Sequence, residues 1–250
     1  GSLLGITDLA SADQYFQGNG AMDGSEPAVA TGSFATAAGA SSFAAGDNAS
    51  AFGVGAAAFG NDSTAIGAFG LASGQGSSAF GFGATALGDF STALGYGSAS
   101  IGLTSMAFGY KASSYGDGAI AIGNEIEVPV SGGGTQVLVT RADGPLSTAI
   151  GSGAASLGVA SLAFGVGAVA QDDYSIAFGF RAQAAFASVA LGTWANASGA
   201  ESVALGHASK ALDDQSIALG DYAETHGHGS MALGSQAHVE GEYASAVGFQ

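Results

Sequence analysis

The chain has 250 residues, of which 47% are hydrophobic and only 10% charged, and its four Lys and Arg residues stand against twenty Asp and Glu residues, for a net charge of −16. Such an acidic chain is a poor partner for the phosphate backbone of a nucleic acid. It holds no cysteine, which excludes both a disulfide framework and a thiolate metal site.

The first thirty residues lie outside the repeat that follows them. They contain the aromatic pair Tyr15-Phe16 and the turn-rich segment Gly18-Asn19-Gly20. We expect residues 1–30 to cap the first repeat, because the end of a stacked sheet exposes unpaired strand edges. The opening GSLLG resembles a cloning remnant before an internal fragment, and neither a basic signal peptide nor an eighteen-residue apolar run is present. We therefore expect any targeting or anchoring segment to lie outside this sequence.

A glycine falls on every seventh position from Gly32 to Gly123. A fixed short period indicates stacked copies of one small unit, none of which can bury its apolar face alone. In a helix, glycine at this period would cost about 1 kcal/mol per copy relative to alanine. Short strands joined by tight turns accommodate such glycines. Residues 31–123 are therefore predicted to form an all-β solenoid.

Alternate glycines end a fuller motif, Ser-x-Ala-h-Gly, in which h is a large apolar residue, as in Ser63 to Gly67 and Ser77 to Gly81. The repeat is therefore about 14 residues long, with two short strands per rung. After an interruption, the motif resumes over residues 147–250. The motif glycines, predicted to form the structural turns, are Gly53, Gly67, Gly81, Gly95, Gly109, Gly123, Gly151, Gly165, Gly179, Gly192, Gly206, Gly220, Gly234 and Gly248.

Alternation along a strand separates the motif into two faces. The h residues, such as Phe52 and Ile66, share one face with the x residues, and the Ala and Ser residues share the other. We expect the h residues inside the roll and the alanines outside, where small side chains would let another subunit's sheet pack closely. Periodicity does not say which face is inner, so the reverse arrangement stays open.

The repeat disappears over residues 124–146. Two β-branched runs, Glu125 to Val130 and Thr135 to Thr140, flank Ser131-Gly132-Gly133-Gly134, which predicts a hairpin-like insert. One interpretation is a tolerated surface excursion. The other is an arm that clasps a neighbouring subunit or contacts a ligand, with the basic Arg141 at its base.

The sequence offers no catalytic or cofactor-binding set. Tripeptides such as Gly81-Phe82-Gly83 lack the third glycine and the following helix of a dinucleotide motif, so we interpret them as repeat turns. The serines recur at one register, and none has a paired base, so no nucleophile is indicated. Without an acid, base and nucleophile set, we expect no enzyme and no cofactor.

The four histidines are potential metal ligands. His226 and His228 would lie on one face of a strand, with Glu224 or Asp221 as the nearest third ligand. The remaining two, at positions 207 and 238, are isolated in the sequence. We interpret His226 and His228 as polar turn residues and expect no metal site.

Side chains at the turns are the candidates for ligand contact. Among the aromatic residues one or two positions after a motif glycine, the candidates are Phe82, Tyr96, Tyr110, Phe180, Trp194 and Tyr222. The first three would form a ladder with steps of about 5 Å. Exposed rings in a row can bind a protein or a sugar, or they can stack on one another and fill a groove of the oligomer.

An acidic stripe lies six residues before several motif glycines. It either keeps the turns hydrated and prevents edge association, or attracts basic host proteins. Its members are Asp89, Asp117, Asp173, Asp214 and Glu242.

The fourteen-residue phrase, repeated over residues 30–123 and 147–250, resembles the YadA-like head repeats of trimeric autotransporter adhesins. The stretch from Tyr15 to Gly39 and the segment 124–146 also resemble the approach to such heads and their insert. The resemblance implies a left-handed parallel β-roll assembled as a homotrimer. It further implies a bacterial cell-surface location, with an outer-membrane anchor outside this fragment.

Four functions are compatible with the sequence. The first is an adhesin head that binds host extracellular-matrix protein, a cell surface or an abiotic surface. The alternative is a passive structural spacer in a surface fibre that carries another binding module. An ice- or polysaccharide-binding solenoid would need a more regular array than Thr64, Thr92 and Thr148 provide. An enzyme comes last.

Overall fold

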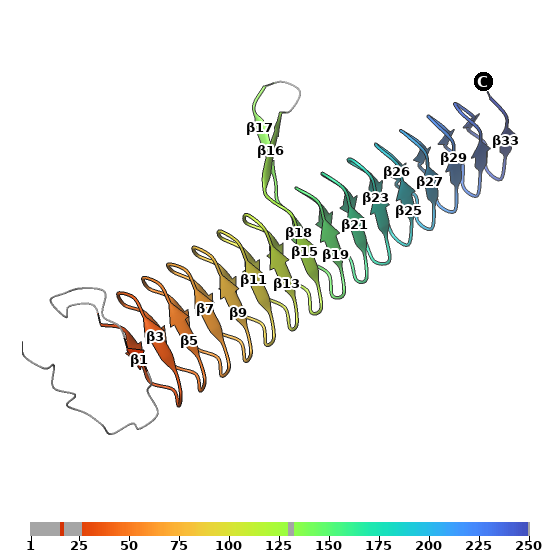
Figure 1. Cartoon of the computed structure of the whole chain (residues 1–250). Helices are drawn as coiled ribbons and strands as arrows, with labels where there is room; N and C mark the ends of the chain where they lie inside the picture. The colour runs from red at the N-terminus through yellow and green to blue at the C-terminus, as the bar shows by residue number, and fades with distance from the viewer. Residues whose placement is uncertain (1–15, 18–26, 130–132, 250) are drawn as a thin grey trace, which may run out of the picture. The chain divides into compact units, whose positions relative to one another are not determined.

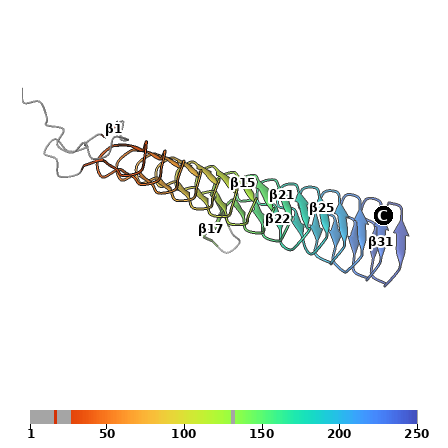
Figure 2. The same ribbon diagram turned by 90° about the horizontal axis from the view of Figure 1, so that it is seen from below.

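The computed structural model describes residues 16–17, 27–129 and 133–249. It confirms an all-β parallel solenoid in which each rung of about fourteen residues holds one strand in each of two sheets (Figures 1 and 2). The chain divides into two compact units, Gly1–Gly97 and Ser98–Gln250. We call the sheet that contains the three-residue strands the long-strand sheet, and the other the short-strand sheet. Among the described residues, no helix is long and apolar enough to span a lipid bilayer.

In the first unit, every neighbouring pair of strands within a sheet is parallel, as in Ala51↔Ala65 and Ala65↔Ala79. The long-strand sheet contains β1 (Phe16–Gln17), β3 (Thr36–Ala38), β5 (Ser50–Phe52), β7 (Thr64–Ile66), β9 (Ser78–Phe80) and β11 (Thr92–Leu94). The short-strand sheet contains β2 (Val29–Ala30), β4 (Phe43–Ala44), β6 (Ala57–Ala58), β8 (Leu71–Ala72) and β10 (Thr85–Ala86).

The second unit repeats this arrangement. Its long-strand sheet contains β13 (Met106–Phe108), β15 (Ile120–Ile122), β19 (Thr148–Ile150), β21 (Leu162–Phe164), β23 (Ile176–Phe178), β25 (Val189–Leu191), β27 (Val203–Leu205), β29 (Ile217–Leu219), β31 (Met231–Leu233) and β33 (Ser245–Val247). Its short-strand sheet contains β12 (Ala99–Ser100), β14 (Ser113–Ser114), β18 (Arg141–Ala142), β20 (Ala155–Ser156), β22 (Val169–Ala170), β24 (Gln183–Ala184), β26 (Asn196–Ala197), β28 (Lys210–Ala211), β30 (Glu224–Thr225) and β32 (His238–Val239).

The interior of the roll is made mainly of alanine and serine, so the expected inward placement of the h residues is wrong. Ala65 is fully buried, whereas the adjacent Ile66 is 41% exposed. Among the described residues, the largest fully buried side chains are Thr140 and Thr225. The two sheets of a rung therefore lie too close together for a leucine or phenylalanine between them. The alternation of two faces is correct, but the large apolar residues point outward.

In some rungs, the hydroxyl of the motif serine forms a hydrogen bond with a backbone carbonyl of the preceding turn. The Oγ atom of Ser105 donates a hydrogen bond to the Gly102 carbonyl oxygen at 2.8 Å, and Ser161 does the same to Gly158 at 2.8 Å. Both hydroxyls are buried, where a carbonyl without a partner would cost about 1–3 kcal/mol. The same bond forms at Ser175, Ser202 and Ser216, whereas the buried hydroxyls of Ser63, Ser77, Ser147 and Ser230 have no partner among the described residues, so this bond accounts for the motif serine in only some of the rungs.

The motif glycines occupy backbone conformations that other residues rarely adopt. Gly53 has a φ of 132°, and a Cβ atom added there would lie 2.7 Å from the carbonyl carbon of Gly67 in the next rung. The motif glycines all have φ between 126° and 152°. Backbone conformation and the close approach of consecutive rungs both require glycine here.

The segment that interrupts the repeat is an antiparallel hairpin of β16 (Ile126–Pro129) and β17 (Thr135–Leu138), which projects from the rungs of the second unit (Figure 1). The buried Thr140 holds its base, because its Oγ1 atom donates to a backbone carbonyl and accepts the Gly153 amide at 3.0 Å. The short-strand sheet resumes at Arg141, in β18. The insert is therefore shorter than the expected range 124–146.

Strand pairing also begins inside the segment expected to be a cap. Phe16 pairs with Thr36 in the long-strand sheet, and Val29 pairs with Phe43 in the short-strand sheet. Tyr15 and the turn-rich residues 18–20 lie outside the described residues.

Candidate functional site

Aromatic rings gather on the turns that follow the long strands of the first unit. Phe82 and Tyr96 stack in parallel, with ring centroids 5.1 Å apart and an interplanar angle of 9°. Phe69 packs edge-on against Phe82 at 5.7 Å. The three rings remain about half exposed. We call Phe69, Phe82 and Tyr96 the first aromatic row.

A second group lies on the corresponding turns of the second unit. Phe180 and Trp194 meet edge to face, with centroids 5.6 Å apart, and the guanidinium carbon of Arg181 lies 4.9 Å from the Trp194 ring. Arg181 has no carboxylate partner in the described part of the chain, whereas Lys111, Arg141 and Lys210 each form an ion pair. This group, Phe180, Arg181 and Trp194, is the second aromatic row.

The hairpin forms one wall of a cleft beside the second aromatic row. Arg181 and Trp194 line the cleft, which has a volume of about 360 Å³, together with Leu138 from β17 and Gln183 from β24. The cleft therefore combines an aromatic face, a cationic group and a side-chain amide. The insert is thus placed beside candidate contact residues.

The other two predicted contact residues have different neighbours. Tyr110 is 44% exposed, and the Lys111 Nζ atom lies 5.1 Å from its ring. The same Nζ donates a hydrogen bond to Glu125 at 2.7 Å, which raises the pKa of Lys111. Tyr222 packs edge-on against His207 at 5.0 Å. The six predicted residues are therefore distributed along the turns rather than gathered in one site.

The four aspartates of the acidic stripe have a structural role that the sequence did not predict. Asp89 accepts a hydrogen bond from the Gln75 amide at 2.8 Å, and Asp117 accepts one from the Leu103 amide at 2.8 Å. Asp173 and Asp214 make the same bond to the amide fourteen residues earlier. Asn61, at the same register, does so as well. The asparagine at this register is the sequence feature that could have predicted the bond. Its side-chain oxygen can replace a carboxylate oxygen only as a hydrogen-bond acceptor.

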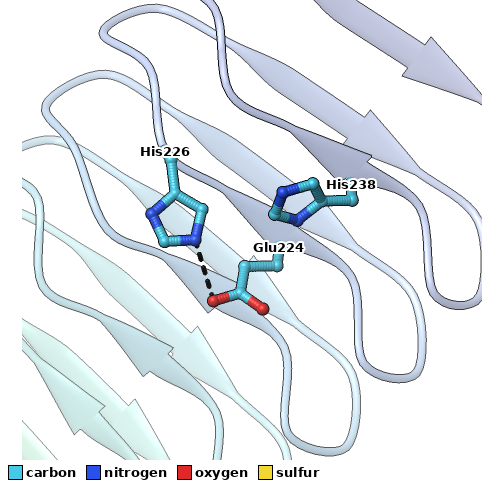
Figure 3. Close-up of side chains that lie close together, drawn as sticks. All are labelled: Glu224, His226 and His238. Atoms are coloured by element: carbon cyan, nitrogen blue, oxygen red, sulfur yellow. Dashed lines mark hydrogen bonds and ion pairs between the residues drawn. The ribbon is translucent and has the colours of Figure 1, made fainter.

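The histidines pair differently from the expectation. His228 packs against Tyr243, with centroids 5.4 Å apart, and does not join His226. His226 lies instead beside Glu224 and His238, and the latter is therefore not isolated (Figure 3). His207 is not isolated either, since its Nδ1 atom lies 2.9 Å from Asp221.

Lys210 and His226 both bond the Glu224 carboxylate. Burial raises the pKa of this carboxyl group, but the hydrogen bonds from the two side chains outweigh burial, and the pKa is lowered overall. The Lys210 Nζ atom lies 3.2 Å from Oε1 of Glu224, and the His226 Nε2 atom lies 2.9 Å from it. The carboxylate therefore remains ionised at neutral pH.

The fold and its surface define a repeat solenoid that presents apolar and aromatic side chains on its outer face and turns. The model of the YadA head domain repeat matches the chain over residues 44–69, 72–98, 100–125, 156–182, 185–209, 197–223 and 226–250. These segments cover more than half of the chain, and the chain therefore belongs to the YadA head family, which is a family of non-enzymatic adhesin heads.

One similar solved structure is the collagen-binding domain of the Yersinia adhesin YadA. It has 24% sequence identity to the chain and a TM-score of 0.26, and the match covers 72% of this chain and 70% of that one. No curated protein matches the chain.

Proposed function

We propose that this chain is an adhesin head that attaches a bacterial cell to host extracellular matrix, to another cell or to an abiotic surface. Its membership of the YadA head family supports this function. The half-exposed rings of the two aromatic rows carry the proposal for ligand contact, because aromatic side chains combine a large apolar area with little conformational entropy to lose. The cell-surface location is part of the same proposal.

We further propose that the head assembles as the left-handed homotrimer that the family resemblance implies, through the outer face of the long-strand sheet. In the second unit this face carries Phe178, 54% exposed, and Leu205 and Leu219, which are more than one third exposed. The outer face of the short-strand sheet is polar on the neighbouring rungs, with Gln183, Asn196, Lys210 and Glu224. A continuous apolar face of this kind favours burial against a partner.

Charge placed on the apolar face should prevent assembly. The double variant Leu205→Glu/Leu219→Glu is expected to sediment as a monomer, because it would bury two carboxylates in the interface. The matched control is Gln183→Glu/Asn196→Glu, which adds the same charge to the opposite sheet and should sediment like the unmodified protein. Sedimentation velocity measures both. Equal sedimentation of the two double variants would contradict the proposed interface.

Loss of the aromatic rows should weaken attachment without unfolding the head. The double variant Tyr96→Ser/Trp194→Ser is expected to lose at least about tenfold in binding, because each weak contact is repeated on every subunit of the trimer. The control is Phe90→Ser/Tyr174→Ser, which removes two aromatic side chains of similar exposure, 61% and 60%, from the turns after the short strands.

Binding is measured on a mass-sensing surface coated with collagen, fibronectin, laminin or bare polystyrene. Collagen is included because the solved Yersinia domain is described as collagen-binding. Saturable capture by one matrix protein that is lost in the aromatic variant and kept in the control supports the adhesin. Capture by none of the four surfaces would favour the spacer, and equal loss in both variants would contradict the assignment to these turns.

A further inference from the structure

Three potential metal ligands meet on the outer face of the short-strand sheet of the second unit. Glu224 in β30 is the direct cross-strand partner of His238 in β32. His226 follows Glu224 by two residues and extends over the same face, so the three side chains converge (Figure 3). One potential ligand atom from each side chain lies within 4.8 Å of those of the other two.

The distances between the potential ligand atoms are close to those in a metal site. Zinc bonds of about 2.0–2.1 Å in a tetrahedral site place neighbouring ligand atoms about 3.3 Å apart. The Glu224 Oε1 atom already lies 2.9 Å from the His226 Nε2 atom. The rings of His226 and His238 have centroids 5.4 Å apart, and both side chains are about 40% exposed. A small rotation about the side-chain bonds of His238 would therefore complete the set.

We propose that Glu224, His226 and His238 bind one divalent transition-metal ion per chain, with zinc as the representative ion. Two imidazoles and one carboxylate form a ligand set that zinc uses when further coordination positions remain open. The net charge of −16 also favours the approach of a cation. This site is separate from the aromatic rows and does not depend on the proposed adhesive function.

The charged side chains around the three potential ligands are compatible with a bound cation. The Lys210 Nζ atom lies 3.2 Å from Oε1 of Glu224 and would compete with the ion, but its side chain is 46% exposed and can turn toward solvent. Glu240, whose Oε1 atom lies 3.3 Å from His238 Nε2, adds a second carboxylate beside the site. Such a group orients an imidazole ligand or becomes a further ligand.

A bound ion would link two consecutive rungs of the solenoid. Each rung of a repeat protein is held mainly by its neighbours, so a link between β30 and β32 should stabilise these rungs against local unfolding. A ligand that binds only the folded state stabilises it by RT ln(1 + [L]/Kd), so the unfolding temperature rises with the free ligand concentration. Zinc should therefore raise the unfolding temperature of the unmodified protein.

The experiment is isothermal titration calorimetry of the full chain, without a histidine tag, with zinc chloride in chelator-free buffer near neutral pH. We expect saturable binding of one ion per chain. His238→Ala and Glu224→Gln should each lower the affinity at least about tenfold. His207→Ala is the matched control, because its histidine also bonds a carboxylate, Asp221, on the surface but lies outside the group of three.

A second measurement separates metal binding from a general loss of structure. Thermal unfolding followed by circular dichroism should show the same zinc-dependent rise in unfolding temperature in the unmodified protein and in His207→Ala, and a smaller rise at the same zinc concentration in His238→Ala and Glu224→Gln. Absence of saturable binding would overturn the proposal. Equal affinity in His238→Ala and the unmodified protein, or an equal loss in His207→Ala, would overturn it as well.

Discussion

Replacing Gly53 with alanine should lower the free energy of unfolding by about 2–6 kcal/mol. The new Cβ atom would lie 2.7 Å from the Gly67 carbonyl carbon, and a φ of 132° would strain any residue other than glycine. Relaxation is limited, because the Gly67 amide is itself bonded to the Phe52 carbonyl oxygen at 2.8 Å. Urea unfolding followed by circular dichroism measures the loss.

Gly83→Ala is the matched control for this substitution. Gly83 also has a positive φ, 62°, but a Cβ atom there would have no neighbour within 4 Å. The expected loss is about 1–2 kcal/mol, from the left-handed conformation alone. Both variants exchange one glycine for alanine, so their effects on the unfolded chain are the same. Equal losses would show that contact between consecutive rungs does not govern the choice of glycine.

Enlarging a buried alanine should destabilise the roll more than truncating the isoleucine beside it. Ala65→Leu is expected to cost about 3 kcal/mol, because Ala65 is fully buried between Ala51 and Ala79 in a space that holds only small side chains. Ile66→Ala should cost less than about 1 kcal/mol within a single chain, since Ile66 is 41% exposed.

Urea unfolding at several protein concentrations measures both variants. Any part of the Ile66→Ala effect that arises from a partner subunit depends on concentration, whereas the effect of Ala65→Leu on the roll itself does not. A buried isoleucine replaced by alanine commonly costs about 2–5 kcal/mol. A loss of that size for Ile66→Ala, independent of concentration, would place the h residue inside the roll.

Most of the fold could be predicted from the sequence because its contacts are periodic. A glycine at every seventh position and the Ser-x-Ala-h-Gly phrase identify the strands, the turns and the parallel stacking, since each rung meets mainly its own copies. The hairpin from Ile126 to Leu138 was also predictable, because its two strands are close in sequence and pair with each other. Its end was less predictable, because Arg141 continues the short-strand sheet without the motif.

The candidate sites were predictable only in part. The exposed rings of Phe82 and Trp194 follow from their positions after motif glycines. The meeting of His226 with His238 does not, because it depends on side chains that extend from one rung to the next. Local alternation suggested His228 as the partner of His226, but His228 lies in a turn and packs against Tyr243.

The sequence by itself determined the repeat, the two strands per rung and the separation of each strand into two faces. The tertiary structure alone decided which face is inside. Side chains along a strand alternate with a period of two whichever face is inside. Hydrophobicity alone would favour burial of Ile66 over Ala65. The choice depends on the space between the two sheets of a rung, which accepts Ala65 and the motif serine Ser105 but no large side chain. The apolar residues therefore face outward.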